Sequence, residues 1–266
     1  MAPLGRGPRR GSYAWGGWLA LALVVLAHVL QSLSSGAYLG GARVTTYPKH
    51  VLILTAHPDD ECMFFAPTIH ALGAHNVTIS ALCLSNGNAD GLGRVRSQEL
   101  LHSYGVLGVP AERVTCLNDP HLQDGMQQVW TPARVRDTVR AHANMTHLDT
   151  ILTFDAGGVS LHPNHRALFH GALQLQAALV ADEARMVALW TLHTWSWRTK
   201  FWGMWASVWQ RVDAHDYLFR STLREYGQSL QAMYQHQTQL VWFRYLYVFF
   251  SSYMYANRVR VVVQEL

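Results

Sequence analysis

The chain has 266 residues, a length that suits one large domain or two small ones. Charged residues make up 14% of the chain, against a typical share of about 25%, and apolar residues make up 50%. This composition excludes an intrinsically disordered chain, and a mean hydropathy of +0.02 is too polar for a bundle of membrane spans. The net charge is +4 without a run of basic residues, so we expect no nucleic-acid partner.

The N-terminal segment predicts a membrane anchor. Residues 1–14 are basic, and residues 15–33 contain no Asp, Glu, Lys or Arg. A run of this length reaches the ~17–25 residues that cross a bilayer, and tryptophans near its start fit the membrane interface. We therefore expect one transmembrane helix over 15–33 and a linker over 34–49. The alternative is a secretory signal peptide, for which Ser35-Gly36-Ala37 offers a cleavage site.

The sequence does not decide on which side of the membrane the rest of the chain lies. Three arginines precede the apolar run, and only Arg43 and Lys49 closely follow it, which favours a lumenal body. Asn76 and Asn144 begin glycosylation acceptor patterns that would be used only in the lumen. The three cysteines are an odd number without a C-x-x-C pair, which favours reduced thiols and a cytosolic body.

Beyond residue 50, short apolar runs alternate with helical patterns. Strands are predicted over 51–55, 77–84, 114–117, 148–154 and 186–192, and helices over 94–107, 132–143 and 166–180. This order predicts an α/β fold, with a mostly parallel Rossmann-like sheet flanked by helices, in a single domain over residues 50–266. Ligands of such sheets bind at the carboxyl ends of the strands.

A cluster of polar side chains, His57-Pro58-Asp59-Asp60-Glu61, directly follows the first of these strands. In a tight turn, His57 and Asp60 can point inward together and offer the nitrogen and oxygen ligands that Zn²⁺ accepts. Asp59 then lies beside the metal, where its carboxylate can take a proton from water. The alternative is that the acidic residues cap a following helix, but a cap does not need this combination of residues.

A second cluster follows the strand over 148–154. Asp155 begins a glycine-rich loop that leads to His162 and His165. The His-x-x-His spacing lets one imidazole bind a metal while the other faces the substrate, so the two clusters together offer two histidines, one carboxylate and an open position. Asp155 is predicted either to orient a histidine or to cap the strand-end turn. Asp119 and Asp124 are candidates for binding sugar hydroxyls, with ordinary turn residues as the alternative.

These motifs resemble the LmbE-like zinc deacetylases, whose marks are the Ala-His-Pro-Asp-Asp-Glu turn and a later His-x-x-His. The resemblance is closer to the PIG-L group, the N-acetylglucosaminylphosphatidylinositol de-N-acetylases of glycosylphosphatidylinositol (GPI) anchor biosynthesis. It covers roughly residues 50–255 and includes the segments 64–68, 87–93, 96–100, 153–160 and 239–244.

The resemblance implies a role for each residue of the two motifs. His57, Asp60 and His165 are expected to bind Zn²⁺ or another divalent metal, and Asp59 is expected to act as the general base. His162 is expected to assist the reaction in its protonated form. Either His162 or the protonated Asp59 then supplies the proton for the leaving amine.

Substrate contacts are expected from Arg96, through the resemblance, and from Asp155. Two positions depart from the family pattern, because Arg94 stands where the family often has Glu and Leu161 stands where it often has Gly. Neither departure removes a predicted ligand or the base, so activity is still expected. The departures leave the shape and charge of the substrate pocket open.

The resemblance implies hydrolysis of the N-acetyl group of N-acetylglucosaminylphosphatidylinositol, with the glycolipid and the lipid bilayer as partners. It also implies a single-pass protein of the endoplasmic reticulum membrane whose catalytic domain faces the cytosol. One alternative is a deacetylase of a soluble N-acetylglucosaminide, and another is a catalytically silent glycolipid-binding protein. The presence of Asp59 argues against a catalytically silent protein, because a glycolipid-binding protein needs no base beside the metal.

Two segments are unusually rich in aromatic residues. Six tryptophans lie between residues 190 and 209, interleaved with Arg198 and Lys200, and the segment 240–255 has Arg244 as its only strong charge. Tryptophans beside basic residues suit a membrane interface, so both segments are predicted to face the membrane. The alternative is a packed aromatic core.

Overall fold

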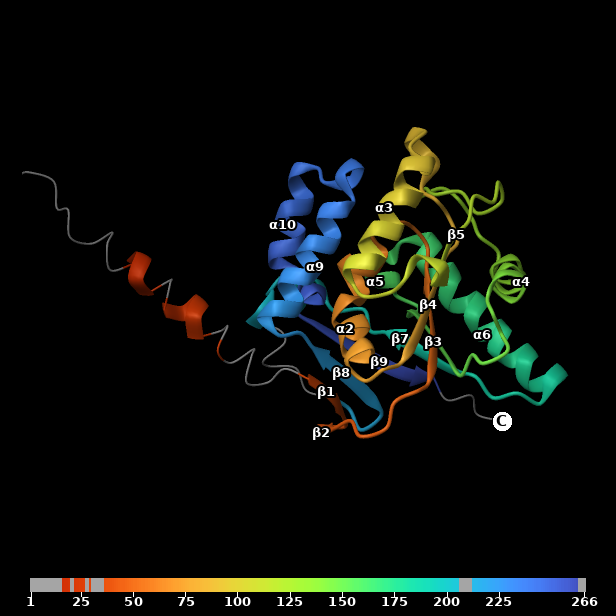
Figure 1. The fold of residues 1–266 in the computed structure, drawn as a ribbon, viewed down its shortest axis with the longest axis horizontal. Coiled ribbons are helices and arrows are strands. Elements are labelled where there is room, and N and C mark those ends of the chain that lie inside the picture. The colour runs from red at the N-terminus through yellow and green to blue at the C-terminus, as the bar shows by residue number, and fades with distance from the viewer. Residues whose placement is uncertain (1–15, 20–21, 27–28, 30–35, 206–211, 263–266) are drawn as a thin grey trace, which may run out of the picture.

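The structure is a computed structural model that describes residues 16–19, 22–26, 29, 36–205 and 212–262 (Figure 1). Its strands are β1 (Gly36–Leu39), β2 (Ala42–Arg43), β3 (His50–Thr55), β4 (Thr78–Cys83), β5 (Val114–Cys116), β6 (Thr150–Phe154), β7 (Ala188–Leu192), β8 (Asp216–Arg220) and β9 (Ala256–Val262). Its helices beyond residue 36 are α2 (Ala66–Ala74), α3 (Gly93–Val106), α4 (Pro132–His142), α5 (Gly158–Leu161), α6 (Pro163–Glu183), α7 (Trp197–Lys200), α9 (Leu223–Gln235) and α10 (Trp242–Phe250). Short helical turns at 61–65, 88–90, 111–113, 237–239 and 252–254 complete the described elements.

The described strands form one mixed sheet in the order β2-β1-β8-β9-β7-β6-β3-β4-β5. The strands from β7 to β5 pair in parallel, whereas β2, β1, β8 and β9 join the sheet in antiparallel pairs. The predicted α/β fold is therefore confirmed, but the expectation of a mostly parallel sheet is wrong. Of these strands, β9 alternates charged and apolar residues at Arg258-Val259-Arg260-Val261, which is typical of an antiparallel strand with one solvated face.

The parallel strands are wound in two directions from the centre of the sheet. The chain runs from β3 through α2 to β4 and through α3 to β5, and then returns through α4 to β6 and through α6 to β7. Figure 1 shows α2 and α3 on one side of these strands and α4 and α6 on the other. Because β3 and β6 are neighbours whose connections leave in opposite directions, their carboxyl ends border the crevice where such sheets bind ligands.

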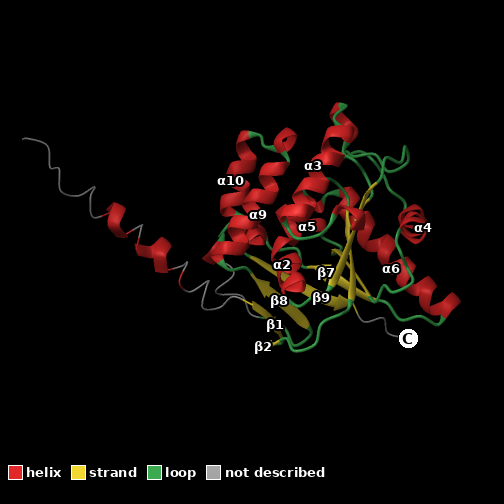
Figure 2. Ribbon diagram, viewed as in Figure 1, coloured by secondary structure: helices red, strands yellow, loops and turns green. Residues whose placement is uncertain are grey.

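Helices lie on both sides of the strands that border this crevice (Figure 2). Ile53 and Leu54 of β3 and Ile151 and Leu152 of β6 are completely buried. Such continuous apolar runs are typical of parallel strands covered on both faces. The crevice therefore lies at the ends of strands that belong to the buried core.

The N-terminal predictions are only partly covered by the structure. The basic segment 1–14 and much of the predicted transmembrane helix over 15–33 lie outside the described residues. Within the described ranges, none of the helices combines the length and the apolar character needed to cross a bilayer. Residues 36–43, predicted as part of a linker, instead form the β1–β2 hairpin, and β1 pairs with β8.

The tryptophan-rich segment divides between core and surface. Trp190 and Trp195 are buried, so the packed-core alternative applies to them. Trp197 and Trp202 are 78% and 56% exposed, and Trp209 lies outside the described residues. The exposed members lie on or beside α7, next to the C-terminal end of α10, where the backbone N–H of Gly203 donates to the carbonyl of Phe250.

Candidate active site

The turn after β3 is held by hydrogen bonds from its own carboxylates. Asp60 Oδ2 accepts the backbone N–H groups of Ala56 and His57, each at 2.9 Å. Asp59 has a φ of 107°, a conformation that is strained for any residue with a β-carbon. Its N–H donates to Glu61 Oε2 at 3.1 Å, and its carbonyl accepts the N–H of Met63 at 3.1 Å. Both ends of the strained residue are therefore fixed, which sets the direction of the Asp59 side chain.

A buried ion pair supports this turn from below. Glu61 Oε1 lies 2.6 Å from His236 Nε2 and accepts the hydroxyl of Ser103 at 2.5 Å, and all three side chains are fully buried. Burial alone would raise the pKa of Glu61, but the charge and hydrogen bond of His236 outweigh it and lower that pKa. Glu61 therefore remains a carboxylate that can hold the backbone of Asp59. His236 carries no recognisable motif in the sequence, so its role could not be predicted.

The loop after β6 is organised by Asp155. Its carboxylate accepts the backbone N–H groups of Gly157, Gly158 and Thr194 at 2.9, 3.1 and 2.6 Å, and the hydroxyl of Thr194 at 2.5 Å. A β-carbon at Gly157 would lie 2.6 Å from Thr194 Oγ1, so glycine is required there. Asp155 thus caps the strand-end turn, which was the alternative prediction. With its oxygens occupied in this way, it is not placed for the predicted substrate contact.

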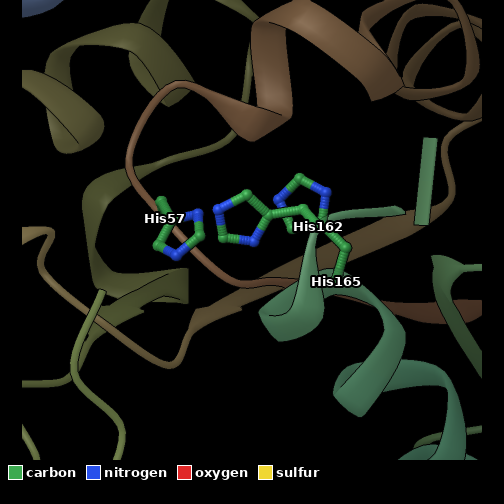
Figure 3. Close-up of side chains that lie close together, drawn as sticks. All are labelled: His57, His162 and His165. Atoms are coloured by element: carbon green, nitrogen blue, oxygen red, sulfur yellow. The ribbon is translucent and has the colours of Figure 1, made fainter. Parts of the chain in front are cut away.

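Three imidazoles converge above the carboxyl ends of β3 and β6 (Figure 3). One ligand atom from each of His57, His162 and His165 lies within 4.8 Å of the other two, an arrangement that can hold a metal ion. His57 comes from the turn after β3, and the other two histidines come from the start of α6. The two clusters predicted from the sequence are therefore brought together.

The donor groups of this site fit a divalent metal. His165 Nδ1 lies 3.2 Å from the carbonyl of Gly158, to which it can only donate, so in a neutral ring Nε2 has a free lone pair. That Nε2 atom lies 3.2 Å from Asp60 Oδ1, which is also an acceptor. Two acceptors this close need a proton or a cation between them. Burial would raise the pKa of Asp60, but the charge and hydrogen bonds of His165 and His57, when these rings are protonated, lower it well below its usual range, so its oxygen is available as an anionic ligand.

Asp124 brings a further carboxylate next to His57. Its Oδ1 lies 3.0 Å from His57 Nε2, and its Oδ2 accepts Arg96 Nη1 at 3.3 Å. Burial would raise the pKa of Asp124, but these contacts lower it to about 2. Asp119 instead pairs with Arg134 at 3.0 Å, outside the site. Of the two acidic residues considered for sugar binding, only Asp124 therefore faces the histidines.

His162 differs from its neighbours in its protonation. Burial, followed by the charges of His165 and His57, lowers the pKa of His162 to about 4. Without a metal, the ring is therefore neutral at pH 7 and has one N–H to donate. This differs from the protonated His162 that the sequence analysis expected.

Arg96 secures the floor of the site. It donates to the carbonyls of Gly87 and Pro58 at 2.8 and 2.9 Å, in addition to its contact with Asp124. Gly87 has a φ of 66°, and a β-carbon there would lie 2.0 Å from Arg96 Nη1, so this position needs glycine on both counts. Arg96 is buried at the cavity wall, and these bonds give it a structural task besides the predicted contact with substrate.

Arg244 reaches the site from α10. Its Nη2 lies 3.0 Å from Asp59 Oδ2. Burial raises the pKa of Asp59, and the charge of Arg244 opposes that rise. A buried carboxyl with a raised pKa is well suited to take up a proton. In the sequence, Arg244 is the only strong charge of an aromatic segment and ends the segment 239–244 of the family resemblance, but neither pattern predicts its contact with Asp59.

These groups line one cavity of about 660 Å³. Its polar floor is formed by His57, Asp59, Asp60, Arg96, Asp124, His162 and His165. Its apolar rim is formed by Phe201, Phe243, Leu246 and Phe250, each about half exposed. Every predicted catalytic residue and metal ligand therefore lies in the same cavity, below an opening bordered by aromatic side chains.

Comparison with known proteins agrees with this geometry. Residues 52–176 match the family described as PIG-L: GlcNAc-PI de-N-acetylase. The chain is 36% identical over 245 residues to the N-acetylglucosaminyl-phosphatidylinositol de-N-acetylase of Bos taurus, covering 92% of this chain and 90% of that protein. It is 34% identical over 244 residues to the probable enzyme of the same name from Schizosaccharomyces pombe, covering 90% and 97%.

The fold is similar to that of N,N'-diacetylchitobiose deacetylase from Pyrococcus horikoshii. The TM-score is 0.57 at 18% identity, over 80% of this chain and 84% of that one. At this identity the similarity shows the fold alone. In this fold, the catalytic cavity lies at the carboxyl ends of β3 and β6, the neighbouring strands whose connections leave in opposite directions.

Proposed function

Because the chain belongs to the N-acetylglucosaminylphosphatidylinositol de-N-acetylase family, we propose that it hydrolyses the N-acetyl group of this glycolipid to give glucosaminylphosphatidylinositol and acetate. The observation that carries the proposal is the single cavity in which Asp59 lies beside the converging imidazoles. A buried base beside a set of metal-binding donors is what hydrolysis of an unreactive amide requires. The product places the enzyme early in GPI-anchor biosynthesis.

We assign Zn²⁺ as the metal and His57, Asp60 and His165 as the residues that hold it. The support is the free lone pair of His165 Nε2 opposite the ionised Asp60, together with the imidazole of His57. When bound, zinc supplies a Lewis acid for the amide carbonyl and a water molecule of lowered pKa.

Asp59 performs the proton transfers in this proposal. Its burial raises its pKa and so favours proton uptake from the attacking water, and the charge of Arg244, 3.0 Å away, opposes that rise and favours the carboxylate form. The strained backbone of Asp59 is fixed at both ends, so the carboxylate keeps its direction during the reaction. The protonated Asp59 then returns the proton to the leaving amine.

His162 stabilises the charge that develops on the amide oxygen. Its neutral ring can donate one N–H, and a preorganised donor in a buried site costs no reorganisation during the reaction. Asp124 is placed to orient His57 from outside the metal-binding set. Its role is therefore to fix a ring rather than to react.

We further propose that the enzyme works at the endoplasmic reticulum membrane, with one transmembrane helix over 15–33 and a cytosolic catalytic domain. The support within the described domain is the exposed aromatic surface of α7 and α10. Trp197 and Trp242 are 78% and 73% exposed and flank the apolar rim. Such rings suit the headgroup region of a bilayer, which would bring the cavity mouth to the membrane plane.

The test is acetate release by the zinc-loaded protein from two substrates, N-acetylglucosaminylphosphatidylinositol in vesicles and its lipid-free headgroup. We expect release from the glycolipid at a clearly higher kcat/KM. Equal values for the two substrates would favour a soluble N-acetylglucosaminide as the true substrate. Absence of release from both would contradict the deacetylase assignment.

A further inference from the structure

A second, apolar pocket lies between α9 and α10. Its volume is about 360 Å³, within the range of about 300–1,000 Å³ found for small-molecule sites. None of the described residues that line it is charged; they are Tyr226, Leu230, Met233, Tyr234, Leu240, Tyr245, Leu246, Val248, Phe249 and Phe250. This lining suits a hydrocarbon, and none of these described residues offers a charge to pair with a charged ligand.

The walls of this pocket are fixed by contacts between the two helices. The residues from α9 recur at helical spacing, so they share one face of that helix. Tyr226 donates its hydroxyl to the carbonyl of Val248 at 3.2 Å, and its ring stacks on Tyr255 at 4.3 Å between centroids. Met233 is buried at the base. The pocket is therefore bordered by packed side chains of both helices.

One ridge of α10 separates this pocket from the catalytic cavity. Leu246 and Phe250 line both, and each is about half exposed. They are four residues apart and so lie on one stripe of the helix. A flexible ligand can therefore occupy both spaces by crossing these two side chains at the surface.

A cation lies on the catalytic side of this ridge. Lys200 lines the catalytic cavity, and its Nζ lies 5.6 Å from the centre of the Phe201 ring. Phe201 in turn contacts Tyr247 of α10, with ring centroids 6.2 Å apart. The histidine floor, this ammonium group and the apolar pocket match the order of N-acetylglucosamine, phosphodiester and hydrocarbon in the substrate, with inositol between the first two.

We propose that the α9–α10 pocket holds one hydrocarbon chain of the glycolipid while its N-acetylglucosamine lies in the catalytic cavity. The chain crosses the ridge at Leu246 and Phe250, and the phosphodiester lies beside Lys200. This inference rests on the proposed function. The hydrocarbon chain moves from the bilayer interior to an apolar pocket, so the move adds little binding free energy. Its main effect is to align the N-acetylglucosamine with Asp59.

The first test fills the pocket with Leu230→Trp and compares it with Leu223→Trp, at the exposed first residue of the same helix and outside the pocket. We expect Leu230→Trp to lower kcat/KM about tenfold for the dipalmitoyl glycolipid in phosphatidylcholine vesicles, as expected when a hydrophobic pocket is blocked. Its kcat/KM for the lipid-free headgroup should be unchanged, and Leu223→Trp should match the wild type on both.

Equal losses on both substrates, or no loss on either, would overturn the chain-binding proposal while wild-type deacetylation still stood. Failure of the wild type to release acetate from either substrate would instead contradict the proposed function. The two failures are therefore distinguishable.

The second test leaves the wild-type protein unaltered. A phosphatidylinositol with a photoreactive diazirine in the middle of one chain is irradiated in vesicles with the protein, and the adducts are mapped by mass spectrometry. We expect adducts on α9 at Leu230, Met233 or Tyr234, and competition by the dipalmitoyl glycolipid. Adducts confined to the exposed side chains of Trp242 and Phe243, outside the pocket, would show simple bilayer insertion and overturn the proposal.

Discussion

The polar floor and the apolar rim of the catalytic cavity are built in opposite ways. The floor lies at the ends of buried strands, and its side chains are tied by hydrogen bonds and ion pairs, as Asp60 is to the backbone of Ala56 and His57. The rim consists of half-exposed aromatic and aliphatic side chains such as Phe243 and Phe250. The floor can therefore set the chemistry for any acetylated amine, whereas the rim decides which substrate is presented to it.

The largest effect is expected from removing a metal ligand in the floor. His165→Ala should abolish both deacetylation and stoichiometric metal binding, because the ring supplies a ligand and contacts Asp60. Metal content by elemental analysis and acetate release measure the two losses.

The same measurement separates Asp60 from His162 as the third ligand. Asp60→Asn should weaken metal binding strongly, whereas His162→Ala should keep most of the metal and lose activity. The reverse pattern would show that the metal is held by the three imidazoles rather than by the predicted set.

A large loss of stability is expected beneath the floor. His236→Ala leaves the buried Glu61 without its cationic partner, which typically costs about 3–5 kcal/mol of unfolding free energy. Denaturant unfolding measures the change, with the exposed His102→Ala as the matched control. A loss no larger than that of the control would show that the pair does not support the Asp59 turn.

Arg244 belongs to α10, the helix that carries most of the rim, and contacts Asp59 in the floor. Its substitution therefore tests whether α10 controls the pKa of the base. Its charge opposes the rise in the pKa of Asp59 that burial causes, so Arg244→Met should raise that pKa further. Because the base acts as a carboxylate, the acidic limb of kcat/KM should move to higher pH, by about one unit or more. The exposed Arg224→Met is the control, and an unmoved limb would contradict the contact.

The smallest effect is expected at the exposed edge of the rim. Trp197→Glu and Trp242→Glu should reduce vesicle binding and glycolipid turnover severalfold, because a charge opposes insertion at the interface. Hydrolysis of the lipid-free headgroup should not change. Met186→Glu, at an equally exposed position before β7, is the control for surface charge. Equal vesicle binding by all three variants would remove the support for a membrane-facing rim.

Most of the floor could be predicted from the sequence because five of its seven residues lie in two short motifs, at 57–61 and 155–165. The turn after β3 and the loop before α6 follow apolar strand patterns, and the topology of parallel strands brings their ends together. The sequence therefore predicted His57, Asp59, Asp60 and both later histidines in one cavity.

The remaining contacts depend on residues distant in the sequence. His236 and Arg244 reach the first motif across more than 170 positions, and no local pattern predicts those contacts. Strand β8 begins and ends with a charged residue and β9 alternates charged and apolar residues, so their pairing with the apolar sheet was not evident. Asp155 was placed in the correct loop, but only the structure shows that the backbone and Thr194 occupy its carboxylate.

Substitution of Asp59 by Asn tests the central claim most directly. Asp59→Asn keeps the shape of the side chain and removes the proton acceptor. The kcat for acetate release should therefore fall by about 10²-fold to 10⁴-fold. Metal content and unfolding free energy should stay close to those of the wild type. Turnover within a fewfold of the wild type at full metal occupancy would contradict the assignment of Asp59 as the base.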